Sequence, residues 1–235
     1  MLQGLREQVL EANLELVRRG LVLYTFGNAS GISREEGLVV IKPSGVPYDE
    51  LRAEHLVVTN LAGDVVEGNL RPSSDLPTHL VLYNQFAEIG GVAHTHSEYA
   101  TAWAQSRRPI PCFGTTHADY FGGQILVTSS MSDQEILHDY EKNTGQAIVR
   151  SLSETSPTAA PGVLVANHGP FAWGKDAMAA AEHAAIVESI ARMAYFTLGI
   201  NAAAEPIGSV LHDKHYRRKH GENAYYGQGK PKPKK

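Results

Sequence analysis

The sequence is poor in cysteine, in long apolar runs and in excess charge of one sign. Its 235 residues include one cysteine, Cys112, so no internal disulfide can form, which indicates a reducing compartment. No stretch approaches the roughly 18 uninterrupted apolar residues of a membrane helix, and the N-terminus mixes charges with leucines, unlike a signal peptide. The formal net charge of −4 gives no indication of nucleic-acid binding. We therefore expect a soluble cytoplasmic protein with neither a membrane nor a nucleic acid as partner.

Internal repeats, long linkers and nucleotide-binding fingerprints are also lacking, which excludes solenoids and propellers and gives no support for a nucleotide cofactor. Apolar residues make up 43% of the chain, enough for a substantial core. We predict one α/β domain over residues 1–226. The Gly/Pro/Lys-rich residues 227–235 are predicted to form a disordered, solvated tail.

Hydrophobic periodicity predicts a mixture of helices and short strands. Helices are expected at residues 2–17, 78–86, 97–105, 132–152 and 176–198. Strands are expected at residues 21–25, 38–41, 56–59, 65–66, 91–96, 125–128 and 162–166. Ser132 and Glu135 form a capping-box pattern at the start of one helix, and Gly63-Asp64 suggests a hairpin.

Three histidines are candidate metal ligands. His94 and His96 are two residues apart on a predicted strand, so their imidazoles should project from the same face. His168 directly follows another apolar strand and precedes a glycine. Three histidines with an open position are typical of a catalytic zinc site, although two polar histidines at a strand end would also explain the His-x-His pattern. Asp75 is a candidate fourth ligand, and helix N-capping is its alternative role.

Small polar segments with exposed amides, hydroxyls and a lysine are suitable for binding an anion. Three such segments are predicted as turns, at residues 27–31, 42–45 and 71–74. Each alone is explained as an ordinary turn, but together, beside a metal site, they favour a small phosphorylated substrate. Ionisable residues also gather at 115–120 and at 215–226, where a solvated helix face is the alternative to an active-site role.

Several long motifs give the chain a resemblance to the epimerase branch of the class II aldolase/epimerase family. The matching segments include TFGNASG, IKPSGV, RPSSDLPTHL, GGVAHTHSEYATAWAQ, GTTHADYF, PGVLVANHGPFAWGK and DKHYRRKHGENAYYGQ. They extend over nearly the whole chain except its Lys-rich end. The resemblance implies a three-layer α/β domain with a mainly antiparallel central sheet flanked by helices, assembled as a homotetramer with active sites between adjacent subunits.

The resemblance also implies roles for individual residues. One divalent metal ion per subunit, usually zinc, would be held by His94, His96, His168 and Asp75. The acid/base pair would be Asp119 and Tyr226, supported by His215. The residues that would bind substrate and its phosphate are Gly27, Asn28, Lys42, Ser44, Gly45, Ser73, Ser74 and Arg218.

The implied activity is the metal-dependent interconversion of L-ribulose 5-phosphate and D-xylulose 5-phosphate, a step of pentose catabolism. Aldolases of the same family carry glutamate where this chain has Asp75, so the aspartate favours the epimerase branch. A class II sugar-phosphate aldolase remains the alternative enzyme. A zinc-stabilised scaffold protein is a more distant alternative, because it would need a closed four-ligand site.

Overall fold

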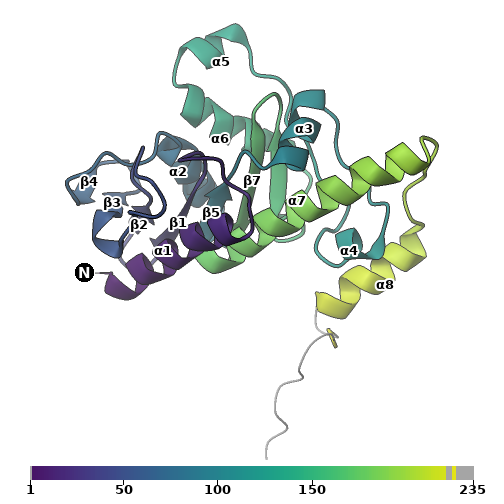
Figure 1. The fold of residues 1–235 in the computed structure, drawn as a ribbon, viewed down its shortest axis with the longest axis horizontal. Coiled ribbons are helices and arrows are strands. Elements are labelled where there is room, and N and C mark those ends of the chain that lie inside the picture. Colours follow the sequence, from purple (N-terminus) through teal and green to yellow (C-terminus); the bar gives the residue numbers. More distant parts are fainter. Residues whose placement is uncertain (1, 221–223, 226–235) are drawn as a thin grey trace, which may run out of the picture.

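The computed structural model describes residues 2–220 and 224–225, and a seven-stranded sheet runs through its centre (Figure 1). The sheet has the order β4-β3-β2-β1-β5-β7-β6, with every neighbouring pair antiparallel. The strands are β1 (Asn28–Ser33), β2 (Leu38–Ile41), β3 (Val57–Asn60), β4 (Val65–Glu67), β5 (Gly91–His94), β6 (Gly162–Val165) and β7 (Gly169–Gly174). The α/β class with an antiparallel sheet is therefore confirmed. Tyr226 and the predicted tail lie outside the described residues.

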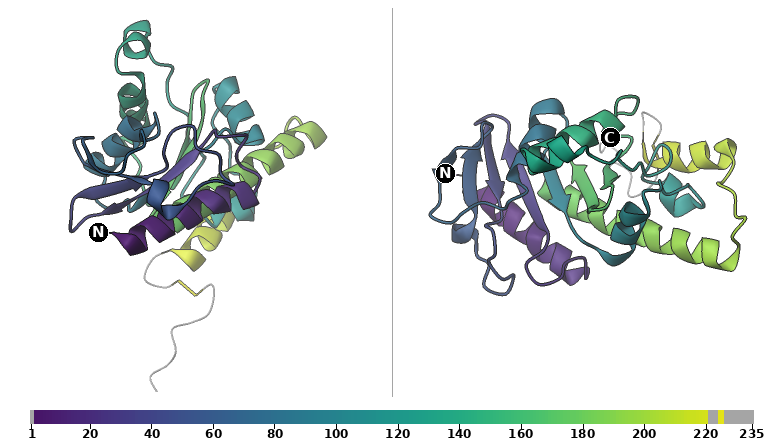
Figure 2. Two further views of the ribbon diagram at one scale, coloured as in Figure 1. Left: turned by 60° about the vertical axis from the view of Figure 1, so that its left-hand side comes forward. Right: turned by 90° about the horizontal axis from the view of Figure 1, so that it is seen from above.

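Helices cover both faces of the sheet (Figure 2). They are α1 (Gln3–Arg18), α2 (Leu76–Gln85), α3 (Glu98–Ser106), α4 (Thr115–Ala118), α5 (Asp133–Leu137), α6 (Tyr140–Ser151), α7 (Ala177–Ile200) and α8 (Ser209–Lys219), with a 3-10 turn η1 (Ala53–His55). Helices α1 and α7 pack together on one face, and α2 and α6 pack together on the other. Strand residues alternate between these faces, so Val39 and Ile41 enter one apolar core while Val40 enters the other. Within the described residues, no helix has both the length and the apolar character needed to cross a bilayer.

The prediction of a polar turn at residues 27–31 is wrong over most of its length. Residues 28–31 belong to the central strand β1. Ala29 and Gly31 pair with β2 or β5 on either side and are buried. The small side chains are required by close packing: a Cβ at Gly31 would lie 2.9 Å from Leu5 Cδ1 and 3.0 Å from Val9 Cγ2 of α1. The glycine and small polar residues that suggested a turn are therefore explained by the close packing of helix α1 against this strand.

Three other expectations are corrected. Residues 21–25 form a loop rather than a strand, and Tyr24 adopts a left-handed conformation with φ of 53° that interrupts any extended run. The helix predicted over 132–152 is two helices, because Asp139 also adopts a left-handed conformation, with φ of 56°. Residues 125–128 make only isolated bridges, such as Val127 to Leu164. The capping box at Ser132 and the hairpin between β3 and β4 are confirmed.

Candidate active site

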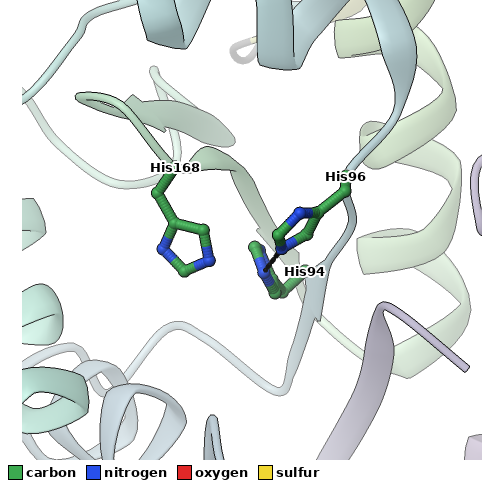
Figure 3. Close-up of side chains that lie close together, drawn as sticks. All are labelled: His94, His96 and His168. Carbon is green, nitrogen blue, oxygen red and sulfur yellow. Dashed lines mark hydrogen bonds between the residues drawn. The ribbon is translucent and has the colours of Figure 1, made fainter.

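The three predicted histidines converge at one end of the sheet (Figure 3). His94 is the last residue of β5, His96 follows two residues later, and His168 lies in the turn between β6 and β7. One ring nitrogen from each lies within 4.8 Å of the others, and the Nε2 atoms of His94 and His96 are 3.1 Å apart. Pairing of β5 with β7, which places His94 opposite Phe171, brings the two chain segments together.

Neighbouring groups set the orientation of His94. Its Nδ1 donates a hydrogen bond to the Pro170 carbonyl oxygen at 2.9 Å, and its ring stacks on Phe171 with centroids 4.1 Å apart. Because a carbonyl oxygen can only accept, Nδ1 carries the proton and Nε2 presents its lone pair to the cluster. This is the arrangement that a metal-ligating histidine needs.

The cluster suits a divalent metal ion. Burial lowers the pKa of His94, of His96 and of His168, the last to about 3, so all three rings are neutral at neutral pH. Neutral imidazole nitrogens are zinc ligands, and bonds of 2.0–2.1 Å in a tetrahedral site place neighbouring nitrogens about 3.3 Å apart. The separation of His94 and His96 agrees with that geometry.

Asp75 lies beside this cluster but not within the three-histidine group. It occupies the N-cap position of α2, yet its side chain makes no capping hydrogen bond, so the alternative N-capping role is wrong. Its Oδ2 instead accepts a hydrogen bond from Asn28 Nδ2 at 2.7 Å. The carboxylate is therefore directed into the same pocket as the imidazoles.

A pocket of about 380 Å³ joins the histidines to the predicted anion-binding segments. Two of these segments are held side by side: Ser73 N–H donates to the Lys42 carbonyl at 3.0 Å, and Ser44 N–H donates to the Arg71 carbonyl at 2.9 Å. Apart from Arg218, every residue predicted to bind substrate or phosphate lines this pocket, namely Gly27, Asn28, Lys42, Ser44, Gly45, Ser73 and Ser74.

Close packing around the pocket constrains two of its residues, Gly27 and Lys42. Gly27 has a φ of 95°, and a Cβ there would lie 2.9 Å from the His94 carbonyl oxygen, so only glycine fits. Lys42 is 2% exposed, its Nζ donates to the Val46 carbonyl at 2.9 Å, and it lies 4.7 Å from the centroid of the Tyr48 ring. Burial lowers the pKa of Lys42 to about 8, so the amine is mostly protonated at neutral pH and can attract an anion.

Asp119, His215 and Arg218 form a second group, which does not line this pocket. Asp119 Oδ1 accepts from Arg218 Nε at 2.8 Å and lies 3.1 Å from His215 Nδ1. Partial burial raises the pKa of Asp119, but the hydrogen bonds from Arg218 and His215 outweigh burial and hold it below its ordinary value. Figure 1 shows α4 and α8 beside the C-terminal half of α7, at one end of the molecule. Tyr226, the predicted partner of Asp119, lies outside the described residues.

Comparison with known proteins identifies the family. Residues 7–195 match the model of the "Class II Aldolase and Adducin N-terminal domain". The chain belongs to this family. Membership confirms the resemblance carried by the sequence motifs and agrees with the antiparallel sheet between helices.

Relatives and solved structures are similar to the chain over most of its length. A protein of Salmonella paratyphi B named L-ribulose-5-phosphate 4-epimerase UlaF is 54% identical over 227 residues, covering 97% of this chain and 100% of the relative. Its counterpart in Salmonella paratyphi C is 53% identical with the same coverage. Among solved structures, an L-fuculose 1-phosphate aldolase superimposes with a TM-score of 0.77 at 25% identity, covering 90% of this chain and 94% of the aldolase chain.

Four further side chains that the residue pattern did not single out line the pocket of this family member, namely Thr25, Phe26, Tyr140 and Glu141. Phe26 comes from the loop before β1, and its ring centroid lies 5.9 Å from that of His96. Tyr140 and Glu141 come from the start of α6. The residue pattern places them inside one continuous helix, and the break at Asp139 that turns them toward the histidines has no clear sequence signature.

Proposed function

We propose that this chain is an L-ribulose-5-phosphate 4-epimerase, which interconverts L-ribulose 5-phosphate and D-xylulose 5-phosphate. Relatives at 53–54% identity over 97% of the chain carry this name. The observation that carries the proposal is one pocket in which three neutral imidazoles and Asp75 lie beside Lys42 and hydroxyl-bearing turns. Such a pocket combines sites for a metal ion and for a phosphate group.

The substrate's own chemistry dictates the reaction. Carbon 4 of a ketopentose phosphate is not adjacent to the carbonyl at carbon 2, so its C–H bond is not acidic and cannot be inverted by simple deprotonation. Cleavage of the bond between carbons 3 and 4 instead gives glycolaldehyde phosphate and a three-carbon enediolate, which keeps the electron pair of the broken bond. Rotation of this aldehyde and re-formation of the bond on its other face invert carbon 4.

We assign the proton transfers to Asp119 and Tyr226. One of the two removes the proton from the carbon 4 hydroxyl as the bond breaks, and the other returns a proton to that oxygen after the aldehyde has rotated. The lowered pKa of Asp119 keeps its carboxylate ionised at neutral pH, and His215 orients it from α8. Groups of this kind typically contribute about 10²- to 10⁴-fold in rate.

The pocket residues hold the substrate and the metal ion. His94, His96, His168 and Asp75 would hold one divalent ion, which we propose is zinc and which supplies Lewis-acid stabilisation of negative charge on substrate oxygens. Seven other lining residues would bind the phosphate through an ammonium group, hydroxyls and backbone amides. They are Gly27, Asn28, Lys42, Ser44, Gly45, Ser73 and Ser74, and Arg218 is assigned to the phosphate from α8.

A homotetramer with sites between adjacent subunits would join the two groups of residues. Asp119 does not line the pocket of its own chain, so a neighbour's Asp119 would complete the site. Large apolar side chains beside the Asp119 group support a buried interface there. They belong to the end of α7 and the start of α8 and are exposed in the single chain: Met193, Tyr195, Phe196, Ile200, Val210 and Leu211.

A pair of assays tests the activity. The purified zinc-loaded protein is incubated with L-ribulose 5-phosphate, and D-xylulose 5-phosphate is measured beside free glycolaldehyde phosphate. Formation of the epimer without accumulating aldehyde is the expected result. Release of aldehyde at the rate of substrate loss would instead identify a class II aldolase.

A mixing experiment tests the shared site. His94→Ala and Tyr226→Phe chains, each inactive alone, are unfolded together and refolded. If ligands and acid/base residues come from different subunits, random assembly leaves about a quarter of the sites intact and restores that fraction of activity. A verified mixed oligomer that stays inactive would show that each site is built within one chain.

A further inference from the structure

Tyr140 contacts the histidine cluster from α6. Its Oη lies 3.4 Å from His168 Nδ1, and its side chain lines the 380 Å³ pocket. Figure 3 shows one ring nitrogen of His168 directed at His94 and the other directed away. Because the hydroxyl meets Nδ1, it lies on the outer side of the ring, and Nε2 is the nitrogen that faces the cluster.

His168 needs an external partner more than His94 does. His94 ends a paired strand, and its Nδ1 donates to a backbone carbonyl at 2.9 Å. His168 follows Asn167, which adopts a left-handed conformation with φ of 62° in the turn between β6 and β7. A ligating histidine requires a hydrogen-bond acceptor at its other nitrogen to set both the tautomer and the ring orientation.

We infer that Tyr140 is a positioning residue that holds the His168 ring in the orientation and tautomer of a metal ligand. The phenol oxygen accepts the hydrogen on Nδ1, which leaves the Nε2 lone pair available to the ion. The inference rests on the proposed metal site and deepens it.

The junction between α5 and α6 holds Tyr140 in place. The Asn143 side chain donates to the carbonyls of Glu135 (3.0 Å) and His138 (2.6 Å), and Thr144 Oγ1 donates to the Tyr140 carbonyl at 2.9 Å. Helix α6 is also pressed against α2, since a Cβ at Gly145 would lie 2.7 Å from Val81 Cβ. Tyr140 therefore presents its hydroxyl from an anchored helix end.

The test compares zinc affinities of wild type, Tyr140→Phe and the matched control Tyr24→Phe, whose side chain is exposed and does not line the pocket. Zinc dissociation constants are measured by competition with a chelator, and the melting temperature of each metal-free protein is recorded. Tyr140→Phe is expected to bind zinc about 10- to 100-fold more weakly, with an unchanged metal-free melting temperature. The Tyr24→Phe variant is expected to match wild type in both measurements.

A spectroscopic measurement distinguishes orientation from a general loss of structure. In ¹⁵N-histidine-labelled, metal-free protein, the Nδ1 resonance of His168 should shift in Tyr140→Phe while those of His94 stay in place. Equal zinc affinity of wild type and Tyr140→Phe would overturn the role of Tyr140, as would weaker binding that parallels a lower metal-free melting temperature. Absence of zinc binding by wild type would overturn the proposed metal site itself, and the inference with it.

Discussion

The histidine cluster and the Asp119 group are built by different parts of the fold. His94 ends strand β5 and His168 lies in the turn between β6 and β7, and the ladders that join these strands bring the two histidines together. Asp119 follows a helix of four residues and is held by charged side chains of α8, a helix with no buried residue. The first region depends on sheet register and on neutral ligands, whereas the second depends on ion pairs. The two should therefore respond differently to substitution, pH and salt.

The largest effect is expected from removing a ligand. His94→Ala, His96→Ala and His168→Ala should each lose bound zinc and epimerase activity while keeping the fold, because the sheet is paired through backbone groups. Metal analysis after dialysis, together with circular dichroism, checks this expectation. The control is His138→Ala, which changes an exposed histidine outside the cluster and should retain both metal and activity. Full zinc occupancy in a ligand variant would remove that residue from the set.

A smaller loss is expected when the second region is changed. Asp119→Asn and Tyr226→Phe should each reduce kcat by about 10²- to 10⁴-fold, the range for general acid/base groups, and should keep one zinc ion per chain. Turnover and zinc content are measured on the same preparation. Unchanged turnover in both variants would exclude the two-residue proton-transfer scheme.

Removing the ion pair without removing the carboxylate tests the electrostatic part of the comparison. Arg218→Gln should raise the pKa of Asp119, because partial burial then acts with less opposition. The acid limb of kcat/KM should therefore move to higher pH, whereas zinc affinity at pH 7 should not change. If Arg218 also binds the substrate's phosphate group, the KM of Arg218→Gln should in addition be higher than that of wild type at every pH.

The stability of the same variant has a defined pH dependence. A lowered carboxyl pKa stabilises the fold above the unfolded value of about 3.9, and this contribution is lost as pH falls through the folded pKa. Wild type should thus be more stable than Arg218→Gln at pH 7, and the difference should shrink below about pH 4. A constant difference across this range would show that Arg218 acts through packing alone.

The smallest effect concerns Lys42 in the pocket. Its folded pKa of about 8 lies below the ordinary 10.5, so the ammonium is mostly present at pH 7 and mostly lost at pH 9. Inhibition by inorganic phosphate should weaken as pH rises above about 8, by up to about tenfold per pH unit. Inorganic phosphate should inhibit the Lys42→Met variant only weakly at every pH, and the dependence of inhibition on pH should be lost. A pH-independent inhibition constant in wild type would exclude Lys42 as the phosphate's cation.

The amino-acid sequence by itself determined the ligand types and much of the local structure. The amphipathic opening helix, the capping box at Ser132 and the His-x-His pattern are local features that hydrophobic periodicity and side-chain chemistry specify. The segments predicted to bind an anion were also identifiable, because hydroxyls, glycine and lysine gather in short stretches. The resemblance then supplied the family and the Asp119 group.

Only the tertiary structure decided where those parts meet. Residues 28–31 read as part of a turn, yet they belong to the central strand β1, where α1 packs so closely that only glycine fits at position 31. Tyr140 reads as an interior helix residue, yet the left-handed Asp139 starts a new helix there and turns it toward His168. The packing of α1 against β1 and the contact of Tyr140 with His168 both join residues distant in the chain. Such contacts override local propensity because burial and close packing outweigh it.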